Sequence, residues 1–302
     1  MSNKEKTLDI QGRKVVLSKP GKEIFPGDGI TKADIVDYYR RIWPHASRHA
    51  SGRPMVLQRF PDGITEEGFY QKKTPDYFPG WIETIGVKLK ENGTVDPYVN
   101  CNSEATIAYL ANQGCITLHL WLSKKENLNK PDRMIFDLDP PKGDFEMVRK
   151  AAFAIHSLFD EAGIHAYPMV TGSKGMHVVI PIKPTEAFDE VRKFARKVAE
   201  KVAASEPEHF TTETSKDKRK GRVFIDYLRN SYGQTAVMPY SLRAIKDAPV
   251  AVPLSWDEAK NHSLDPQKYT MHNIFRRMAR KKDPWRNMHK NAVPLKEIRS
   301  LL

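Results

Sequence analysis

Residues 133–141 constrain the fold more than any other segment of the chain. They read Arg-Met-Ile-Phe-Asp-Leu-Asp-Pro-Pro, an apolar run that carries two carboxylates and is stopped by two prolines. A short apolar run of this kind predicts a buried strand. Because side chains alternate between the faces of a strand, Asp137 and Asp139 project from the same face, about 7 Å apart. Two carboxylates must therefore share one surface of a largely buried sheet.

Other segments predict helices and strands that do not alternate strictly. Helical periodicity covers 31–43, 144–163 and 188–204, a shorter helix is expected over 105–110, and the pattern turns helical and polar from about residue 250. We expect Pro44 to end the first of these helices. Strands are expected over 55–60, 68–72, 115–122, 166–170, 177–180 and 222–228. The predicted fold class is α+β with mixed or antiparallel sheets.

The composition is that of a globular protein with a basic excess. The 302 residues include 49 Lys and Arg against 37 Asp and Glu, a formal net charge of +12, and 40% of them are hydrophobic. This hydrophobic fraction supports a packed core and excludes wholesale disorder. The net charge favours attraction to polyanions such as nucleic acid, although it also suits simple solubility. Other residues must decide between these two explanations.

The sequence predicts a cytoplasmic protein without a membrane partner. A run of about 18 apolar residues, which a spanning helix requires, does not occur. The polar start Met1–Lys6 does not resemble an export signal. Cys101 and Cys115 are too few for a disulfide framework or a four-cysteine zinc site, so we expect them to be small buried residues in a reducing compartment.

A third carboxylate favours a catalytic cation site. Asp226 interrupts the apolar segment 224–228, as Asp137 and Asp139 interrupt theirs. Three aspartates on adjacent strands would form the clamp used in phosphoryl and nucleotidyl transfer, with two cations about 4 Å apart. Carboxylate oxygens suit Mg²⁺ or Mn²⁺. The alternative is that Asp137 and Asp139 face water or cap the turn before Pro140.

The turn 171–177 is a candidate phosphate-binding segment. It reads Thr-Gly-Ser-Lys-Gly-Met-His, and such a turn can present backbone N–H groups to phosphates. Its spacing is not that of a Walker A loop, and the same residues also make an ordinary turn. Arg243 is a second candidate cation for a triphosphate, with a surface salt bridge as its alternative. His119 is either a ligand or a satisfied core histidine.

Several blocks together resemble the polymerase domain of bacterial ligase D, a member of the archaeo-eukaryotic primase superfamily that serves non-homologous end joining. The blocks that match in order and approximate spacing are 53–54, 59–63, 69–72, 119–121, 137–140, 172–177, 226–230 and 239–244. The resemblance extends from about Lys19 to Asp257 and implies a primase-like catalytic core with two mixed or antiparallel β-sheets flanked by helices.

The resemblance also implies an arrangement along the chain. Residues 1–302 would form a single primase-polymerase domain. Its N-terminal part, to about residue 50, would be helical and bind a 5′-phosphate. The catalytic core would span about 51–250, and a helical extension about 251–302.

The resemblance implies a role for each matched residue. The catalytic metal ligands would be Asp137, Asp139 and Asp226, which would hold two Mn²⁺ or Mg²⁺ ions. The residues around the incoming nucleotide would be His119, Thr171, Ser173, Lys174, His177, Arg229 and Arg243. The DNA contacts would be Lys22, Lys32, Gln58, Arg59, Phe69 and Tyr70. Among these contacts, Lys22 and Lys32 would hold the 5′-phosphate, and Phe69 and Tyr70 would stack on template bases, which reads no sequence.

The implied activity is template-directed extension of a primer 3′-hydroxyl by a nucleotidyltransferase that uses NTPs or dNTPs, prefers ribonucleotides and releases pyrophosphate. The implied partners are DNA ends, either gapped or with a 3′-overhang and a 5′-phosphate, together with Ku and a DNA ligase at the nucleoid. Three residues depart from the family pattern, namely Gln58 for lysine, Thr171 for serine, and Arg229 where arginine and glutamine alternate. None of these departures removes a predicted metal ligand.

Other functions remain open at this point. A primase of the same superfamily would synthesise primers de novo, although the lack of a zinc-binding cysteine cluster favours end joining. A metal-dependent nuclease would also use clustered aspartates, but it would consume DNA without nucleotides. A non-catalytic DNA-end binding module would need no metal and would form no product.

Overall fold

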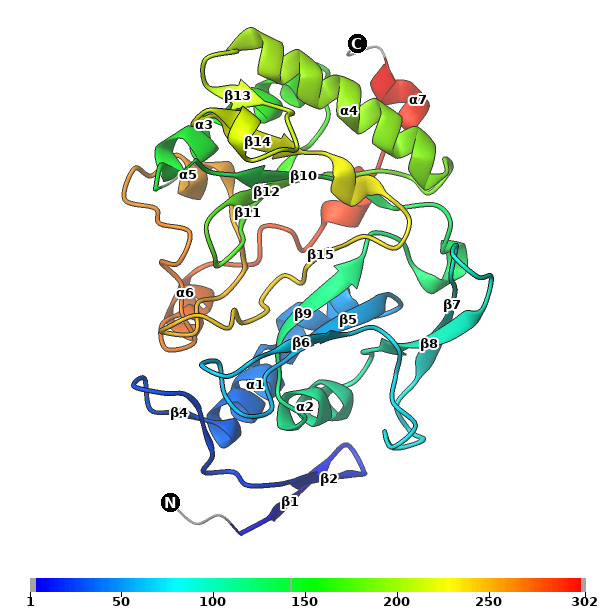
Figure 1. Cartoon of the computed structure of the whole chain (residues 1–302), viewed down its shortest axis with the longest axis vertical. Coiled ribbons are helices and arrows are strands. Elements are labelled where there is room, and N and C mark those ends of the chain that lie inside the picture. Colours follow the sequence, from blue (N-terminus) through cyan, green and yellow to red (C-terminus); the bar gives the residue numbers. More distant parts are fainter. Residues whose placement is uncertain (1–3, 142, 300–302) are drawn as a thin grey trace. The chain divides into compact units, whose positions relative to one another are not determined.

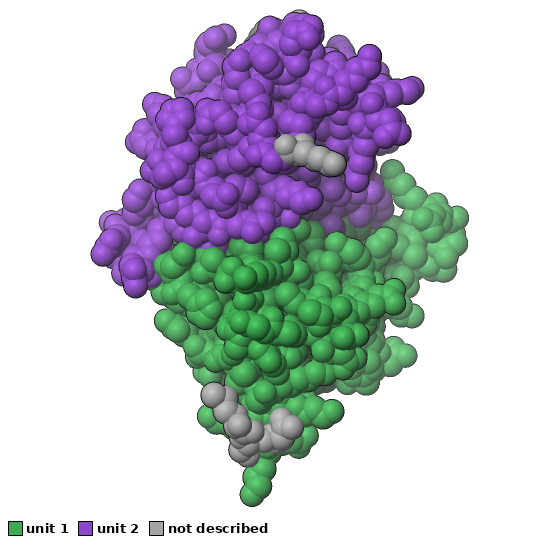
Figure 2. All heavy atoms as spheres, turned by 60° about the vertical axis from the view of Figure 1, so that its left-hand side comes forward, with its two compact units in different colours: residues 1–121, 237–250, 270–275 green, residues 122–236, 251–269, 276–302 purple. Residues whose placement is uncertain are grey.

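The computed structural model of the protein describes residues 4–141 and 143–299 (Figure 1). The chain divides into two units, which Figure 2 colours separately. Unit 1 comprises residues 1–121, 237–250 and 270–275, and unit 2 comprises residues 122–236, 251–269 and 276–302. The first three residues of the polar start lie outside the described residues.

Unit 1 is built on a sheet with the strand order β9-β5-β8-β7, in which β6 also pairs with β5. These strands are β5 (Pro54–Arg59), β6 (Phe69–Gln71), β7 (Thr84–Lys88), β8 (Val95–Asn100) and β9 (Cys115–Trp121). Two strand pairs precede the sheet, β1 (Lys6–Ile10) with β2 (Arg13–Leu17) and β3 (Glu23–Phe25) with β4 (Ile30–Thr31). Helices α1 (Lys32–Ala50) and α2 (Glu104–Asn112) pack against each other, and α2 also contacts β9.

Helix α1 begins at a capping box and continues through a proline. The Thr31 hydroxyl accepts a hydrogen bond from the Asp34 N–H, and the Asp34 carboxylate accepts one from the Thr31 N–H. The prediction that Pro44 ends this helix is wrong, because the helix runs on to Ala50. Ala46 and Ala50 are fully buried, so packing of the last turns offsets the hydrogen bond that Pro44 removes.

Unit 2 is built on a mixed sheet with the strand order β13-β14-β10-β12-β11-β16. The β13–β14 pair is parallel, whereas β10 pairs antiparallel with both β12 and β14. The strands are β10 (Arg133–Asp139), β11 (Tyr167–Val170), β12 (Met176–Pro181), β13 (Phe210–Thr211), β14 (Val223–Asp226) and β16 (Val252–Pro253). The helices α3 (Phe145–Asp160) and α4 (Phe188–Ser205) both contact β10 and β14, and they contact each other. The predicted α+β class is confirmed.

Short elements complete the chain. Within unit 2 these are α5 (Trp256–Ala259), α7 (Leu295–Ile298) and the 3₁₀ helices η1 (Lys125–Asn127), η2 (Asp217–Arg219), η3 (Leu228–Asn230) and η4 (Met288–Asn291). The strand β15 (Thr235–Val237) and the helix α6 (Ile274–Arg280) run across unit boundaries along the chain. Cys101 and Cys115 are buried thiols, as expected. None of the helices in the described part of the chain combines the length and the apolar character that crossing a membrane requires.

The alternation of side chains along β10 separates an apolar face from an acidic one. Phe136 and Leu138 are fully buried, and the ring centroid of Phe136 lies 6.2 Å from that of Phe159 in α3. Asp137 and Asp139 therefore project from the face of the sheet that is turned away from α3. The two carboxylates share one face, as the sequence predicts.

The end of β14 is fixed by side chains that bond to the backbone. Asp226 Oδ1 accepts a hydrogen bond from the Leu228 N–H at 2.7 Å, and the strand stops there, two residues earlier than predicted. The buried Asn230 then bonds to both backbone groups of one residue of β10. Its Oδ1 accepts from the Ile135 N–H at 2.8 Å, and its Nδ2 donates to the Ile135 carbonyl at 2.7 Å. Asn230 thus continues the pairing of β14 beside β10, two residues before Asp137.

We expect Asn230→Ala to lower the free energy of unfolding by about 3 kcal/mol, because the buried N–H and C=O of Ile135 would both lose their partner. Urea denaturation followed by circular dichroism measures this loss. Asn92→Ala is the matched control, since Asn92 Oδ1 accepts from the Thr94 N–H in an exposed turn, and its loss should stay within about 1 kcal/mol. Equal losses for the two variants would contradict the role of Asn230.

Candidate active site

A row of three titratable side chains crosses the sheet of unit 2. The register places Asp137 of β10 opposite His177 of β12 on one side and opposite Asp226 of β14 on the other. Side chains of directly opposed residues share a face, with their Cβ atoms about 5 Å apart. Asp139, two residues further along β10, projects from the same face. The structure therefore brings the three predicted aspartates together.

Two basic groups hold Asp137 in its ionised form. His177 Nε2 lies 3.3 Å from Asp137 Oδ1, and Arg229 Nε donates a hydrogen bond to Asp137 Oδ2, also at 3.3 Å. Burial by itself raises the pKa of Asp137, but His177 and Arg229 outweigh burial and lower this pKa to about 2. Arg229 Nε also lies 3.7 Å from Asp226 Oδ2, so one guanidinium serves two carboxylates.

Negative charge remains in excess around the other two aspartates. Burial, assisted by Asp137 and Asp226, raises the pKa of Asp139 to about 6 from its ordinary value of 3.8. Burial also raises the pKa of Asp226, although the hydrogen bond from the Leu228 N–H opposes that rise. Arg219 and Arg229 reduce both shifts without cancelling them. A bound cation would relieve this repulsion.

The donor chemistry of this site fits a divalent cation. Three carboxylates share one face, and Nδ1 of the buried His177 has no hydrogen-bond partner among the described residues. Within residues 4–141 and 143–299, however, no group of three or more His, Cys, Asp or Glu side chains is arranged to hold a metal ion. Arg229 already contacts oxygens of Asp137 and Asp226. A cation would have to compete with Arg229 for these oxygens.

The turn between β11 and β12 is closed by its own hydroxyl. Thr171 Oγ1 donates to the Gly175 carbonyl at 3.1 Å and accepts from the Ser173 N–H at 3.4 Å. Thr171 is buried, so its hydroxyl supports the turn from inside. Gly175 is required because a Cβ at this position would lie 2.0 Å from the carbonyl oxygen of Leu138. The turn therefore packs against β10 at Leu138, between Asp137 and Asp139.

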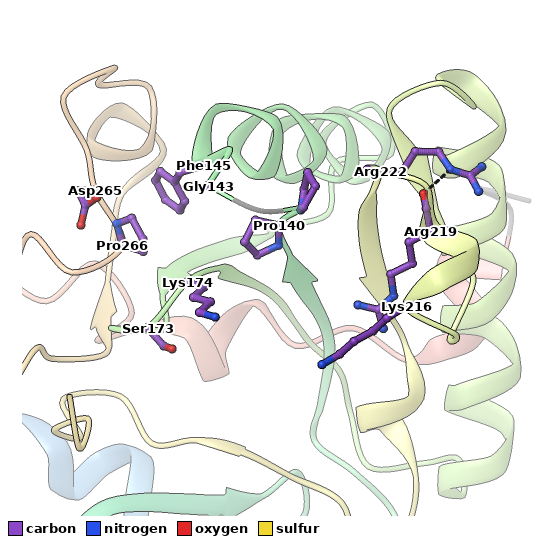
Figure 3. Close-up of a pocket in the computed structure, with 12 residues that line it drawn as sticks. Pro140, Gly143, Phe145, Ser173, Lys174, Lys216, Arg219, Arg222, Asp265 and Pro266 are labelled. Carbon is purple, nitrogen blue, oxygen red and sulfur yellow. Dashed lines mark hydrogen bonds between the residues drawn. The ribbon is translucent and has the colours of Figure 1, made fainter. Parts of the chain in front are cut away.

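A cavity of about 830 Å³ opens beside this turn (Figure 3). Its lining residues come from the segments after β10, between β11 and β12, before β14 and after α5, and they are Pro140, Pro141, Gly143, Phe145, Ser173, Lys174, Lys216, Arg219, Gly221, Arg222, Asp265 and Pro266. Four of these residues are cationic and one is a carboxylate, so the cavity suits an anion. In Figure 3, Lys174 and Lys216 extend into it from opposite sides.

The sequence predicts Ser173 and Lys174 as nucleotide-binding residues but does not place the basic residues of segment 216–222 in the same site. Residues 214–221 read as a polar loop, and the charges of residues 216–220 are expected to be mostly solvated, with a contact to duplex DNA as the alternative. The structure orders this segment by hydrogen bonds from arginines to backbone carbonyls. Arg222 Nε donates to the Arg219 carbonyl at 2.9 Å (Figure 3), and Arg219 Nε donates to the Glu213 carbonyl at 3.1 Å. The available signal was the run of basic residues just before the strand that carries Asp226.

The remaining predicted residues belong to unit 1. His119 on β9 and Tyr70 on β6 stand edge to face, with ring centroids 5.8 Å apart. Gln58 lies opposite Tyr70 in the register, and these three side chains share one face of the unit 1 sheet. Arg243 is half-buried, and its backbone N–H donates to the Pro249 carbonyl at 2.8 Å.

Phe69 and Tyr70 occupy opposite faces of β6. Both are exposed, and adjacent residues of a strand point in opposite directions. Phe69 lies opposite Arg59 in the register, and the Arg59 guanidinium carbon lies 5.4 Å from the Phe69 ring centroid. Arg59 itself is buried, so its side chain positions neighbours more readily than it meets a ligand.

The two lysines predicted to bind a 5′-phosphate lie near each other in unit 1. Lys22 Nζ forms an ion pair with Asp62 Oδ1 at 2.6 Å, and Lys32 Nζ donates to Ser18 Oγ at 3.3 Å. Burial lowers the pKa of Lys32, and the charges of Lys22 and Lys19 lower it further. Three lysines therefore concentrate positive charge here, with Asp62 as a counter-ion.

Comparison with protein families decides the class of the chain. The family model described as "LigD, primase-polymerase domain" matches residues 31–285. The chain belongs to this family. All the predicted catalytic aspartates of this LigD primase-polymerase domain lie within the match, and the predicted resemblance is confirmed.

Relatives of the LigD primase-polymerase domain occur in several bacteria. The multifunctional non-homologous end joining protein LigD of Mycolicibacterium smegmatis is 31% identical over 254 residues, which are 83% of this chain and 33% of that protein. The bifunctional non-homologous end joining protein LigD of Bacillus subtilis is 31% identical over 281 residues, which are 92% of this chain and 44% of that protein. The chain thus spans between a third and a half of the length of these relatives.

A solved structure confirms the predicted fold. The polymerase domain from Mycobacterium tuberculosis ligase D, in complex with DNA, superimposes with a TM-score of 0.85 at 27% sequence identity. The similarity covers 92% of this chain and 99% of the other. The α+β architecture with several sheets is therefore that of a LigD polymerase domain.

We expect Asp139→Asn to raise the melting temperature at pH 8 in metal-free buffer. Because the folded-state pKa of Asp139 is raised to about 6 from 3.8, the ionised carboxylate destabilises the folded protein above pH 6, and this penalty disappears as the pH falls towards 4. Thermal melts with EDTA between pH 4 and pH 8 measure the difference in melting temperature between Asp139→Asn and the wild type. This difference should be largest at pH 8 and should shrink as the pH falls from 6 towards 4.

The exposed Asp37, which pairs with Arg41 on α1, provides the control variant Asp37→Asn, for which we expect no such gain. Added Mn²⁺ should raise the melting temperature of the wild type more than that of Asp139→Asn. Identical melting temperatures for wild type and Asp139→Asn at pH 8 would contradict the crowding of carboxylates.

Proposed function

We propose that this LigD primase-polymerase domain is a template-directed nucleotidyltransferase that extends a primer 3′-hydroxyl at broken or gapped DNA. The observation that carries the proposal is the register of β10, β12 and β14, which gathers three carboxylates on one face. A cavity lined by cations opens beside them. The similar solved structure contains DNA, and the relatives are named as end-joining proteins, which supports DNA ends as the substrate.

In the proposed reaction the 3′-oxygen of the primer attacks the α-phosphorus of an NTP or dNTP, the hydroxyl loses its proton, and pyrophosphate leaves. Two divalent cations, Mn²⁺ or Mg²⁺, would neutralise charge on the triphosphate and on the attacking oxygen. Asp137, Asp139 and Asp226 would hold these cations. His177 and Arg229 keep Asp137 ionised for that task.

The cavity of unit 2 would receive the triphosphate. Its volume of about 830 Å³ suits a nucleotide-sized ligand. Lys174 and Lys216 would donate to phosphate oxygens, and Arg219 adds positive charge close to Asp139. Roles for His119 and Arg243 in nucleotide binding follow from the resemblance and belong to the proposal.

The preference for ribonucleotides, the partnership with Ku and a DNA ligase, and a location at the nucleoid in the cytoplasm rest on the resemblance to the ligase D family. They are parts of this proposal, as is the assignment of the whole chain to a single primase-polymerase domain.

We expect Asp139→Ala to reduce nucleotide addition by about a thousandfold or more, because the cations it helps to hold stabilise the transition state by several kcal/mol. Extension of a labelled primer on a gapped, 5′-phosphorylated duplex measures this loss, and fluorescence anisotropy on the same DNA should show binding largely intact. Glu200→Ala, on the exposed surface of α4, is the control and should extend normally. Retained extension by Asp139→Ala would remove the assignment.

The lysine cluster of unit 1 would recognise the 5′-phosphate on the far side of a gap. A phosphate dianion carries more charge than a carboxylate and accepts more hydrogen bonds. It would therefore displace Asp62 from Lys22, whereas an end that bears a 5′-hydroxyl would not. The ion pair between Lys22 and Asp62 thus favours phosphorylated ends over other parts of the DNA backbone.

We expect the wild type to bind a 5′-phosphorylated gap about tenfold more tightly than its 5′-hydroxyl form, as one charge-assisted contact would provide. The double variant Lys22→Ala/Lys32→Ala should bind both forms equally. The single variant Lys22→Ala, which leaves the buried Lys32 unchanged, should lose most of the preference. Lys14→Ala, on the exposed part of β2, is the control. Asp62→Asn should tighten binding of the phosphorylated gap, because Asp62 would no longer compete with the phosphate for Lys22. A preference that survives in Lys22→Ala would contradict the assignment.

A further inference from the structure

The face of β6 that carries Phe69 is continued by a second exposed ring, Tyr77. Tyr77 follows β6 in the loop 72–83 and is 62% exposed, and Phe69 is 45% exposed. Both rings contact the same buried residue, Arg59, so they lie close together. Large aromatic side chains that stand in water beside one another often mark a surface that receives a ligand.

Arg59 fixes the positions of both rings. Its Nη1 donates to Tyr77 Oη at 2.8 Å and to Gln71 Oε1 at 2.6 Å, and its Nε donates to the Gln113 carbonyl at 3.0 Å. Its guanidinium carbon lies 5.4 Å from the Phe69 ring centroid. With 7% of its surface exposed, Arg59 is locked in this place before any ligand arrives. Prior ordering of both rings lowers the entropy cost of binding.

The loop that carries Tyr77 is anchored from its inner side. The adjacent Phe78 is buried, and its ring packs edge to face on Tyr109 of α2, with centroids 5.1 Å apart. Tyr77 and Phe78 themselves stand edge to face at 5.2 Å. The buried ring therefore holds the loop, while the exposed ring is left outside and is fixed there through its hydroxyl.

Exposed charges of both signs lie beside the two rings in sequence. Lys72 and Lys73 are exposed in the segment that joins β6 to Tyr77, whereas Glu66, Glu67 and Asp76 are exposed carboxylates on either side of these lysines. Flat apolar faces next to cations match the chemistry of unpaired nucleotides, which offer a stacking face and a phosphate.

We propose that Phe69 and Tyr77 form a stacking platform for an unpaired base of bound DNA, with Arg59 as its positioning residue. The inference rests on the proposed function, since it names a further contact of the same DNA. Tyr70 does not belong to this platform because it projects from the opposite face of β6, towards His119. Tyr77 thus adds a third aromatic side chain to the two that the sequence singled out.

The test measures binding to DNA with a 3′-overhang in which one abasic site is moved along the unpaired bases. The wild type should lose affinity, by about fivefold or more, when the abasic site removes the stacked base. Tyr77→Ala should bind intact DNA more weakly by a similar factor and should be insensitive to the abasic site at that one position. Tyr77→Phe, which keeps the ring but loses the bond from Arg59, should lose less.

Two further variants separate positioning from general damage. Val95→Ala removes another side chain of unit 1 that is 62% exposed, and its abasic profile should equal that of the wild type. Arg59→Met keeps a long buried side chain and should lose the abasic sensitivity at the same position as Tyr77→Ala. A purely structural role for Arg59 would instead weaken binding without changing the profile.

The outcomes distinguish this inference from the proposed function. If gapped DNA is extended normally and Tyr77→Ala keeps the abasic profile of the wild type, the platform is wrong and the polymerase assignment stands. If the wild type binds no DNA with a 3′-overhang, both are wrong. Binding with the expected profile supports the platform even where extension fails.

Discussion

The register of β10 between β12 and β14 is the constraint on which the rest of the candidate active site depends. A slip of one residue would turn Asp137 and Asp139 into the face that packs on α3 and would bring Phe136 out of it. Features on both sides of β10 oppose such a slip. Gly175 approaches the Leu138 carbonyl so closely that no side chain fits at this position. Asn230 bonds to both backbone groups of Ile135. The acidic row is therefore set by backbone contacts.

Electrostatics in unit 2 follow from this row. Three carboxylates that share one face repel one another, and His177 and Arg229 compensate mainly Asp137. The excess that remains at Asp139 shows as a pKa of about 6. A pKa perturbed in this way is typical of functional sites, including those that bind a charged ligand. The cavity beside this acidic row has the opposite charge, since most of its charged lining residues are cations. An acidic row beside a basic cavity complements a substrate that joins metal ions to a triphosphate.

Local pattern was enough to predict the longer helices, most strands of unit 2 and the acidic face. It missed the strands β1–β4, β7 and β8 of unit 1, and it failed where residues distant in sequence decide the structure. Alternation along residues 133–139 placed Asp137 and Asp139 on one face, and no long-range information was needed. In contrast, the bond from Arg229 to Asp137 joins residues 92 apart in sequence, and a single sequence carries no signal for it. The bond from Arg59 to Tyr77 likewise depends on a strand pairing and a loop path. Pro44 was misjudged because burial of the following turns outweighs the local preference of proline.

The net charge of +12 attracts a polyanion, but the ion pairs decide where an anion can bind. On α4 several cations are paired within the helix, as Lys193 is with Glu190 and Arg196 with Glu200, so this basic surface is largely neutralised by its own residues. Lys174, by contrast, is exposed and lines a cavity. A count of basic residues would give these lysines and arginines equal weight. The ion-pair partners of each basic residue distinguish those that keep the protein in solution from those that can bind a phosphate.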